Sequence, residues 1–448
     1  MGAAETIPSL LIRNGLIVTM NDAYDVVTGD VSIRGGKIVA VASSIAEPHD
    51  AVLDAQGGFV LPGLVQTHVH LCQTLFRSYA DDLPLMDWLR KRVWPMEAAH
   101  TPASLRAAAR LATTELLLGG TTSVLTMETV HDTDVVFEAA ADSGIRATIG
   151  KCMMDAAADG TPARLRESAR GSLDESRQLR SRWHGAADGR LRAAFAPRFA
   201  VSCSRELLEA VASESADTRT LVHTHASENR DEIAIVRELS GGRSNIEYLA
   251  AVRLASPRLC AAHCVWVDDR EQALLREHDV KVMHCPSSNL KLGSGLAPVV
   301  EMRGRGITVS LGADGAACNN RLDMFEEMRL AALLQATRRA PGALTARDAL
   351  TMATRDGART LGLDDEIGSI EAGKRADLIV VDHERLHLVP AADPYSALVY
   401  AARGADVRTT IVDGAILVDE FAPKRVDLNE LRATARAEAR RLADRAGL

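Results

Sequence analysis

The sequence has 448 residues and a formal net charge of −8, and 47% of its residues are hydrophobic and 25% charged. This is the composition of a globular protein with a large core, and an acidic balance with scattered basic residues argues against a nucleic-acid partner. No run of about eighteen apolar residues occurs, so we expect no membrane partner, and the first residues lack the pattern of a signal peptide. We therefore expect a cytoplasmic protein whose seven cysteines, which form no CxxC pair, are reduced thiols.

Short β-like runs separated by turn residues occupy both ends of the chain. Asn14-Gly15 and Gly35-Gly36 each lie between alternating apolar segments, which is the signature of a hairpin turn. Similar runs with glycine turns return at 368–382 and 407–419. We predict one small antiparallel β-sandwich domain formed by residues 1–62 and 367–448, including a C-terminal helix over 427–446 capped by Asp427.

From residue 63 the pattern changes to strand, loop and helix, repeated. In the stretch 100–127, Thr101 caps a helix that Pro102 begins, Gly119 and Gly120 end it, and a β-like run follows. Eight such runs alternate with helices over about 300 residues, which predicts an α/β fold, a TIM (β/α)8 barrel over residues 63–366. A doubly wound sheet is the alternative, but no glycine-rich phosphate turn follows the first run. The eight runs are FVLPGLVQTHVH, TTSVLTM, IRATIGK, LRAAFAP, TLVHTHA, LCAAHCV, VKVMHC and TVSLGAD.

Side chains suited to metal chemistry stand at or just after the ends of four of these runs. His68 and His70 end the first, and residues two apart in a strand point to the same side. His225, His263 and Asp314 hold the corresponding places in three later runs. Each alone fits a hydrogen-bonded histidine or an aspartate in a turn. Because chemistry in a barrel collects at the carboxyl ends of the strands, we expect the five side chains to meet there.

Imidazoles and a carboxylate together suit Zn²⁺ and also tolerate Fe²⁺, with one ion per chain. Such a ligand set leaves a place for water, whose pKa the metal lowers towards neutrality. The predicted ligands are His68, His70, His225 and Asp314.

Two further residues are predicted to act beside this metal. Glu228, three residues after His225, is placed to carry a proton from the attacking water to the leaving group. His263 is placed to orient the water or to stabilise the tetrahedral intermediate, whereas we interpret His223 as structural. Phosphate loops, GxSxG elbows and CxxC pairs are absent from the sequence, so metal-assisted hydrolysis is the chemistry that remains.

The motifs PGLVQTHVH, HASE, AAHC and GADG, in this order, resemble the amidohydrolase superfamily in its branch of aminopurine and triazine deaminases. The resemblance extends from about residue 9 to residue 420. It implies a barrel with a flanking β-sandwich, a mononuclear zinc or iron site, and hydrolytic release of ammonia from an aromatic ring. It also implies that Glu228 is the proton shuttle, that His263 is the family's histidine after strand six, and that Asp314 joins in proton transfer.

One part of the resemblance points to nucleosides. ADDLPLMDWL with Trp88 and WPMEA with Glu97 are similar to deaminases of S-adenosylhomocysteine, methylthioadenosine and 5'-deoxyadenosine. This similarity implies that both residues contact the nucleoside and that Glu97 holds the ribose diol. Lys151 replaces the basic residue that this group carries after strand three, and Arg164 is the other candidate for contact with a homocysteine carboxylate.

Another part of the resemblance points to guanine. Gln73 and the APRF segment, with Arg198 and Phe199, resemble guanine deaminase, which implies that Gln73 and Arg198 read the base. An arginine only donates hydrogen bonds, so it suits a substrate carbonyl. The alternative for Arg198 is an ion pair with Glu or Asp, and Trp88 and Phe199 are either a sandwich for the purine plane or ordinary packing.

The sequence therefore predicts a metal-dependent hydrolytic deaminase of an aminopurine, either an adenosine-type nucleoside or guanine. An s-triazine hydrolase and a pterin deaminase are the alternatives in the same class, and a non-catalytic scaffold barrel is the alternative in another. The expected partners are a small heterocyclic amine and water, with a homo-oligomer, dimer or tetramer, in which the helix at 88–96 is an interface or a pocket lid.

Overall fold

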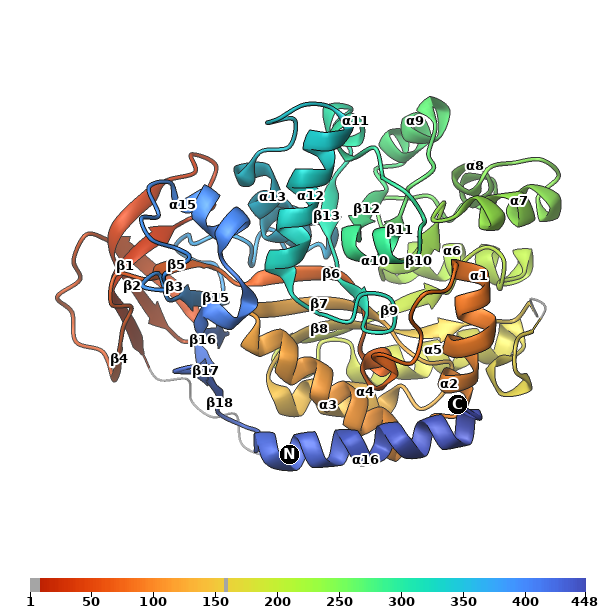
Figure 1. Ribbon diagram of the computed structural model, residues 1–448, viewed down its shortest axis with the longest axis horizontal. Coiled ribbons are helices and arrows are strands. Elements are labelled where there is room, and N and C mark those ends of the chain that lie inside the picture. Colours follow the sequence, from red (N-terminus) through yellow and green to blue (C-terminus); the bar gives the residue numbers. More distant parts are fainter. Residues whose placement is uncertain (1–8, 157–159) are drawn as a thin grey trace.

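The computed structural model describes residues 9–156 and 160–448. Residues 1–8, on which part of the signal-peptide expectation rests, lie outside the described residues. Two β-sheets organise the described chain, with helices packed around the second of them (Figure 1).

The first sheet takes its strands from both ends of the chain, as the sequence predicts. Its spatial order is β18 (Ala422–Pro423), β17 (Ala415–Asp419), β16 (Val407–Val412), β15 (Leu378–Val381), β5 (Phe59–Pro62), β1 (Leu10–Val18), β2 (Val26–Arg34) and β3 (Lys37–Ala42), with β4 (Ala51–Asp54) paired with β1. It is a mixed sheet, because β1 runs parallel to both β4 and β5. The prediction of an antiparallel unit is wrong for these two pairs.

The two predicted hairpin turns have different outcomes. Gly35-Gly36 joins β2 to β3 in an antiparallel pair, which confirms the hairpin predicted there. The prediction at Asn14-Gly15 is wrong, because β1 continues through both residues. The register against β2 shifts between Ile12 and Gly15, and Asn14 has a φ of 56°. This is a β-bulge, which requires the same left-handed backbone as a tight turn, so the local sequence alone does not distinguish the two.

The second sheet consists of parallel strands and takes residues from all eight predicted runs. The first run is divided, because Phe59–Pro62 belongs to the first sheet and only the part from Leu64 onward to the second. Its members are β6 (Leu64–His70), β7 (Thr121–Met127), β8 (Arg146–Met153), β9 (Leu191–Pro197), β10 (Val222–Ala226), β11 (Leu259–His263), β12 (Lys281–His284), β13 (Val309–Leu311) and β14 (Asp314–Gly315). Strand β13 pairs with β12, whereas β14, which begins three residues after β13 ends, pairs with β6. The last strand segment thus returns to the first strand.

Helices follow most strands of the second sheet. Those between β6 and β13 are η1 (Leu71–Phe76), α1 (Leu85–Trp88), η2 (Leu89–Val93), α2 (Trp94–Ala98), α3 (Pro102–Leu118), α4 (Asp134–Ser143), η3 (Ala163–Leu165), α5 (Ala169–Trp183), α6 (Arg205–Thr218), α7 (Arg230–Leu239), α8 (Asn245–Ala251), α9 (Asp269–Glu277), α10 (Pro286–Lys291) and α11 (Val299–Gly304). Those after β14 are α12 (Met324–Arg338), α13 (Ala346–Ala353), α14 (Arg355–Thr360), α15 (Pro394–Ser396), η4 (Ala397–Ala401), η5 (Gly404–Asp406) and α16 (Leu428–Ala446).

Two predicted helices are confirmed together with their caps. The side chain of Thr101 accepts a hydrogen bond from the backbone of Ser104 at the start of α3, and Pro102 is the first helical residue. Asp427 caps α16 by accepting from the backbone N–H groups of Asn429 and Glu430. Capping satisfies N–H groups that have no partner within the helix. It depends on neighbouring residues, so both helix starts could be predicted from the local sequence.

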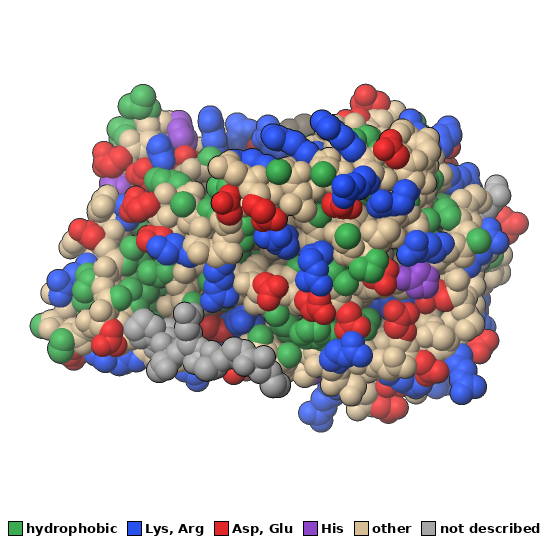
Figure 2. Space-filling view, turned by 90° about the horizontal axis from the view of Figure 1, so that it is seen from below, with side chains coloured by type: hydrophobic (Ala, Val, Ile, Leu, Met, Phe, Trp, Pro, Cys, Tyr) green, Lys and Arg blue, Asp and Glu red, His purple; other side chains and the backbone are tan. Residues whose placement is uncertain are grey.

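Helix α16 lies along α3 at the lower edge of the molecule (Figure 1). On the face seen from below, basic and acidic side chains of the described residues are interspersed among polar and apolar ones (Figure 2). In the described part of the chain, every helix is too short or too polar to cross a lipid bilayer.

A buried ion-pair cluster connects the two sheets. Arg146, at the start of β8, donates to both carboxylate oxygens of Asp377, at 2.8 and 3.0 Å, and to Asp413 at 2.7 Å. Asp377 precedes β15 and Asp413 follows β16, so one guanidinium joins the second sheet to two strands of the first. The three side chains are 3%, 1% and 9% exposed, so little water screens the charges.

Removing this guanidinium should destabilise the protein strongly. Replacing Arg146 with Met preserves much of the packing but leaves the Asp377 carboxylate buried without its partner, at an expected cost of about 3 kcal/mol. The urea midpoint of the variant measures this loss. Arg106→Met is the control, because its pair with Glu138 is 44% exposed on both sides and should be worth less than about 1 kcal/mol. Equal losses in the two variants would contradict the role of the buried cluster.

Candidate metal centre

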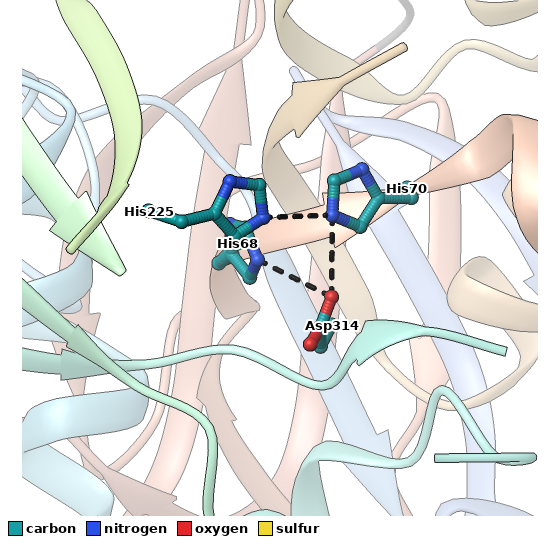
Figure 3. A group of neighbouring side chains, drawn as sticks. All are labelled: His68, His70, His225 and Asp314. Carbon is teal, nitrogen blue, oxygen red and sulfur yellow. Dashed lines mark hydrogen bonds and ion pairs between the residues drawn. The ribbon is translucent and has the colours of Figure 1, made fainter. Parts of the chain in front are cut away.

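Four side chains meet at the carboxyl ends of the parallel strands, as the sequence predicts (Figure 3). His68 and His70 project from the end of β6, His225 from β10 and Asp314 from the start of β14. Their ligand atoms all lie within 4.8 Å of one another. Asp314 Oδ1 is 3.3 Å from His68 Nε2 and 3.2 Å from His70 Nε2, and the Nε2 atoms of His70 and His225 are 3.3 Å apart.

Backbone carbonyls determine which way two of the imidazole rings face. The Nδ1 atom of His70 lies 2.6 Å from the carbonyl oxygen of Met127, and that of His225 lies 2.6 Å from the carbonyl oxygen of Arg198. A carbonyl only accepts, so each Nδ1 carries a proton, and Nε2 is the ring atom that remains available to a metal. Both Nε2 atoms are on the side of the four-residue cluster. This is how proteins orient histidine ligands of metals.

The third ring is oriented by another histidine. His68 Nδ1 lies 2.6 Å from Nε2 of His223, and both rings are completely buried. Sequence reasoning took His223 as merely structural, and this contact to a predicted ligand was missed. Its signal is the spacing of two between His223 and His225, which places both on the inner side of β10.

The protonation of these groups suits a metal ion. Burial lowers the pKa of His68 to about 4 and that of His225 well below its usual value, so both rings are neutral near pH 7. Burial also lowers the pKa of His70, but its hydrogen bond with Asp314 outweighs burial and raises that pKa. A metal would displace this proton on binding.

An unpaired atom tests whether a metal fits. His68 Nε2 is buried and has no hydrogen-bond partner among the described residues, although a buried nitrogen without a partner is costly. It points at the same Asp314 oxygen that His70 faces. A cation bound among three nitrogens and this oxygen would pair all of them, and such a ligand set is typical of zinc. The residues present therefore fit Zn²⁺.

The predicted acid–base residues stand next to the cluster. His263 Nε2 is 3.6 Å from Glu228 Oε2 and 3.9 Å from Asp314 Oδ2. Asn289 Oδ1 accepts from His263 Nδ1 at 2.9 Å, which directs Nε2 towards the two carboxylates. Burial raises the pKa of Glu228. A raised pKa makes the carboxylate a stronger base, which suits a group that takes a proton and then returns it.

Sequence reasoning missed the side chains that hold these carboxylates. Ser288 Oγ donates to Asp314 Oδ2 at 2.7 Å, and Ser294 Oγ donates to Glu228 Oε1 at 3.1 Å. Glu232 Oε2 accepts from the backbone N–H of Glu228 at 2.8 Å. The available signals were the polar run CPSSNLKLGSG directly after a strand and the capping pattern at the start of α7.

A pocket opens in front of the cluster, and four of the seven predicted substrate residues line it. These four are Gln73, Trp88, Arg198 and Phe199. The remaining lining combines apolar and acid–base side chains: His70, Leu85, Leu89, His225, Glu228, Glu232, His263, Leu292 and Asp314. The helix predicted at 88–96 is divided among α1, η2 and α2, and its first turns form part of the pocket wall.

The other three predicted substrate residues are not among the described residues that line the pocket. Glu97 is buried in an ion pair with Arg198. Lys151 is fully buried, with its Nζ 2.6 Å from Glu167. Arg164 has a half-exposed side chain, 3.7 Å from Asp132. The structure thus does not bring Lys151 or Arg164 to the place where a homocysteine carboxylate was expected.

Comparisons with known proteins agree with this centre. A model of the Amidohydrolase family matches residues 59–417. A 5'-deoxyadenosine deaminase of Methanosarcina acetivorans is 40% identical to this chain over 439 residues, covering 98% of this chain and 99% of the relative. A 5-methylthioadenosine/S-adenosylhomocysteine deaminase of Symbiobacterium thermophilum is 39% identical over 440 residues, covering 97% and 99%.

Solved structures are also similar. An adenosine deaminase from Xanthomonas campestris with bound zinc superposes with a TM-score of 0.90 at 33% identity, covering 97% of this chain and 98% of that one. Atrazine chlorohydrolase from Arthrobacter aurescens complexed with zinc gives 0.90 at 29%, covering 96% and 100%. Guanine deaminase from C. acetobutylicum with bound guanine gives 0.82 at 26%, covering 91% and 99%.

Changing His223 should weaken metal binding without touching a ligand. His223→Leu removes the partner of His68 Nδ1, so the affinity for zinc should fall about 10- to 100-fold, as for other residues that orient metal ligands. His223→Gln retains an oxygen that can accept from that ring and should lose less. Competition with a fluorescent zinc chelator measures both affinities. An unchanged affinity in His223→Leu would show that His68 does not need this contact.

Proposed function

Because this chain belongs to the amidohydrolase family, we propose that it is a zinc-dependent deaminase that hydrolyses the amino group from the purine ring of an adenosine-type nucleoside. The proposal is carried by one geometric observation, the Glu228 carboxylate and the His263 ring meeting beside the cluster of three histidines and Asp314. The curated relatives that match nearly the whole chain bear the names of 5'-deoxyadenosine and 5-methylthioadenosine/S-adenosylhomocysteine deaminases, which favours a nucleoside over a free base.

One zinc ion per chain would be held by His68, His70, His225 and Asp314. When bound, zinc supplies the Lewis acidity that makes water a nucleophile near neutral pH. Glu228 accepts a proton from the attacking water at its carboxylate and then gives it to the departing amino group, which leaves as ammonia. His263 Nε2, between the carboxylates of Glu228 and Asp314, orients the water. Ser288 and Ser294 hold the two carboxylates in place.

The surroundings of the reacting ring are consistent with an aromatic substrate. Trp88 and Phe199 line the pocket and are proposed to cover the two faces of the purine plane. Leu85, Leu89 and Leu292 provide apolar walls beside them. An apolar pocket that holds a few directed polar groups is typical of a small-molecule site.

Guanine is the second candidate substrate. Gln73 and Arg198 both line the pocket, and a guanine deaminase is among the similar solved structures. A triazine hydrolase is the third hypothesis, and it rests on the similarity to atrazine chlorohydrolase. The nucleoside is preferred because the relatives named for it share more of the sequence.

We further infer that the second sheet is a closed (β/α)8 barrel. The pairings of β13 with β12 and of β14 with β6 support closure around one divided strand. In the same way, the strands that the first sheet takes from both chain ends support a composite domain of residues 1–62 and 367–448 beside a barrel domain of residues 63–366.

A panel of substrates tests the proposed function. Ammonia release by the zinc-loaded protein should be fastest with 5'-deoxyadenosine, methylthioadenosine, S-adenosylhomocysteine or adenosine, and at least tenfold slower in kcat/KM with guanine and a chlorotriazine. A higher kcat/KM for guanine would show that the substrate is the free base and not a nucleoside. No turnover of any purine would overturn the proposal while leaving the metal centre intact.

Replacing the proton carrier should separate catalysis from metal binding. Glu228→Gln removes the group that moves the proton, so kcat should fall by about 10²- to 10⁴-fold while the zinc content stays at one per chain. Metal analysis and ammonia release measure the two quantities. Glu209→Gln, an exposed acid-to-amide change on α6, is the control and should retain full activity. Unchanged turnover in Glu228→Gln would remove Glu228 from the mechanism.

A further inference from the structure

A buried polar cluster closes one side of the pocket and joins three elements. Glu97 comes from α2, Arg198 from the segment after β9 and Gln73 from η1. Arg198 donates from Nη1 to Glu97 Oε2 at 2.5 Å and from Nη2 to Oε1 at 3.2 Å, which is a two-point ion pair. Gln73 Nε2 donates to the same Oε1 at 3.1 Å. The side chains of Arg198 and Glu97 are only 5% and 2% exposed.

The positions of the three side chains differ relative to the pocket. Gln73 and Arg198 are among the residues that line it, whereas Glu97 lies behind them. The Glu97 carboxylate already accepts three hydrogen bonds, and both of its oxygens are occupied by donors from the chain itself. Because the Glu97 side chain is only 2% exposed and is absent from the lining of the pocket, a ribose diol would have to displace Arg198 or Gln73 to reach it. Displacement would leave a buried guanidinium without a counter-charge.

We propose that Glu97 is a positioning residue, which holds Arg198 and Gln73 against the pocket, and that this chain recognises the ring of its substrate without gripping the ribose diol. The inference rests on the proposed function, since it concerns a nucleoside in this pocket. It replaces the role expected for Glu97 from the resemblance.

Glu97 also determines the orientation of the Gln73 amide. A carboxylate only accepts, so Gln73 must turn its NH₂ group towards Glu97. Its Oε1 is then left buried without a partner among the described residues. Gly315 leaves the space for this oxygen, because a Cβ at position 315 would overlap it. A heterocycle that offers an amino group or a ring N–H would pair this acceptor, and a sugar hydroxyl is not needed for that contact.

The first test needs no variant. Adenosine and 2',3'-dideoxyadenosine differ only in the diol, so wild-type kcat/KM values should agree within about threefold if the carboxylate is not available. A carboxylate that grips the diol would instead make the dideoxy substrate about 100-fold worse or more, because a buried polar group would lose its partner. That result would overturn the proposal.

Variants then test the positioning role. Glu97→Gln should lower kcat/KM for both nucleosides by the same factor, and Glu97→Asp, which retains the charge, should recover part of the loss. The double variant Glu97→Met/Arg198→Met should lose no more than Glu97→Met alone, because the two residues act as one unit. Glu138→Gln, an acid-to-amide change in an exposed ion pair, is the matched control. If the losses of the single variants Glu97→Met and Arg198→Met instead multiply in the double variant, the two residues do not act as one unit.

A binding measurement separates failure of this inference from failure of the proposed function. If the wild-type protein deaminates no nucleoside, the proposed function fails. Calorimetric titration of the zinc-loaded Glu228→Gln protein with adenosine and 2',3'-dideoxyadenosine then judges the inference. Equal Kd values support it. A Kd at least tenfold lower for adenosine, or no binding of either nucleoside, overturns it.

Discussion

The metal centre depends on hydrogen bonds to the Nδ1 atoms of its histidines. Met127 ends β7 and fixes His70, the carbonyl of Arg198 follows β9 and fixes His225, and His223 on β10 fixes His68. None of these partners comes from the strand of the ligand that it orients. The contacts of His70 and His225 join neighbouring strands, whereas the contact between His68 and His223 joins β6 to β10, which are not neighbours in the sheet. The rings therefore point to a common centre only when the whole sheet, and not one pair of strands, is correctly formed.

Sequence periodicity was sufficient for the strands and for the ligands. The alternation that places His68 and His70 on one side is a local property, and the rule that chemistry gathers at the carboxyl ends of parallel strands brought His225 and Asp314 to the same place. The bulge at Asn14-Gly15 was not predictable in the same way, because a turn and a bulge share their backbone chemistry. Only the strand that lies alongside distinguishes them.

The substrate contacts were less predictable because charges pair over long separations in the sequence. Glu97 and Arg198 are 101 residues apart, and nothing in either segment indicates that they meet. Lys151 and Glu167 are closer in the chain, yet their pairing removes a cation that the sequence offered to the substrate. A charged side chain in a predicted pocket can bind a substrate only if no residue of the protein itself is its counter-charge. Which charges pair within the protein is decided by tertiary contacts.

Arg198 serves the site twice, with its backbone and with its side chain. Its carbonyl oxygen fixes the ring of His225, and its guanidinium is paired with Glu97 at one side of the pocket. Evolution of substrate preference is therefore constrained at this residue, since any change that moves the backbone here also turns a metal ligand. Trp88 and Leu292 line the same pocket on other segments, α1 and the end of α10, whose backbones hold no metal ligand. New substrate ranges are more accessible by substitution on that side, where the metal is left undisturbed.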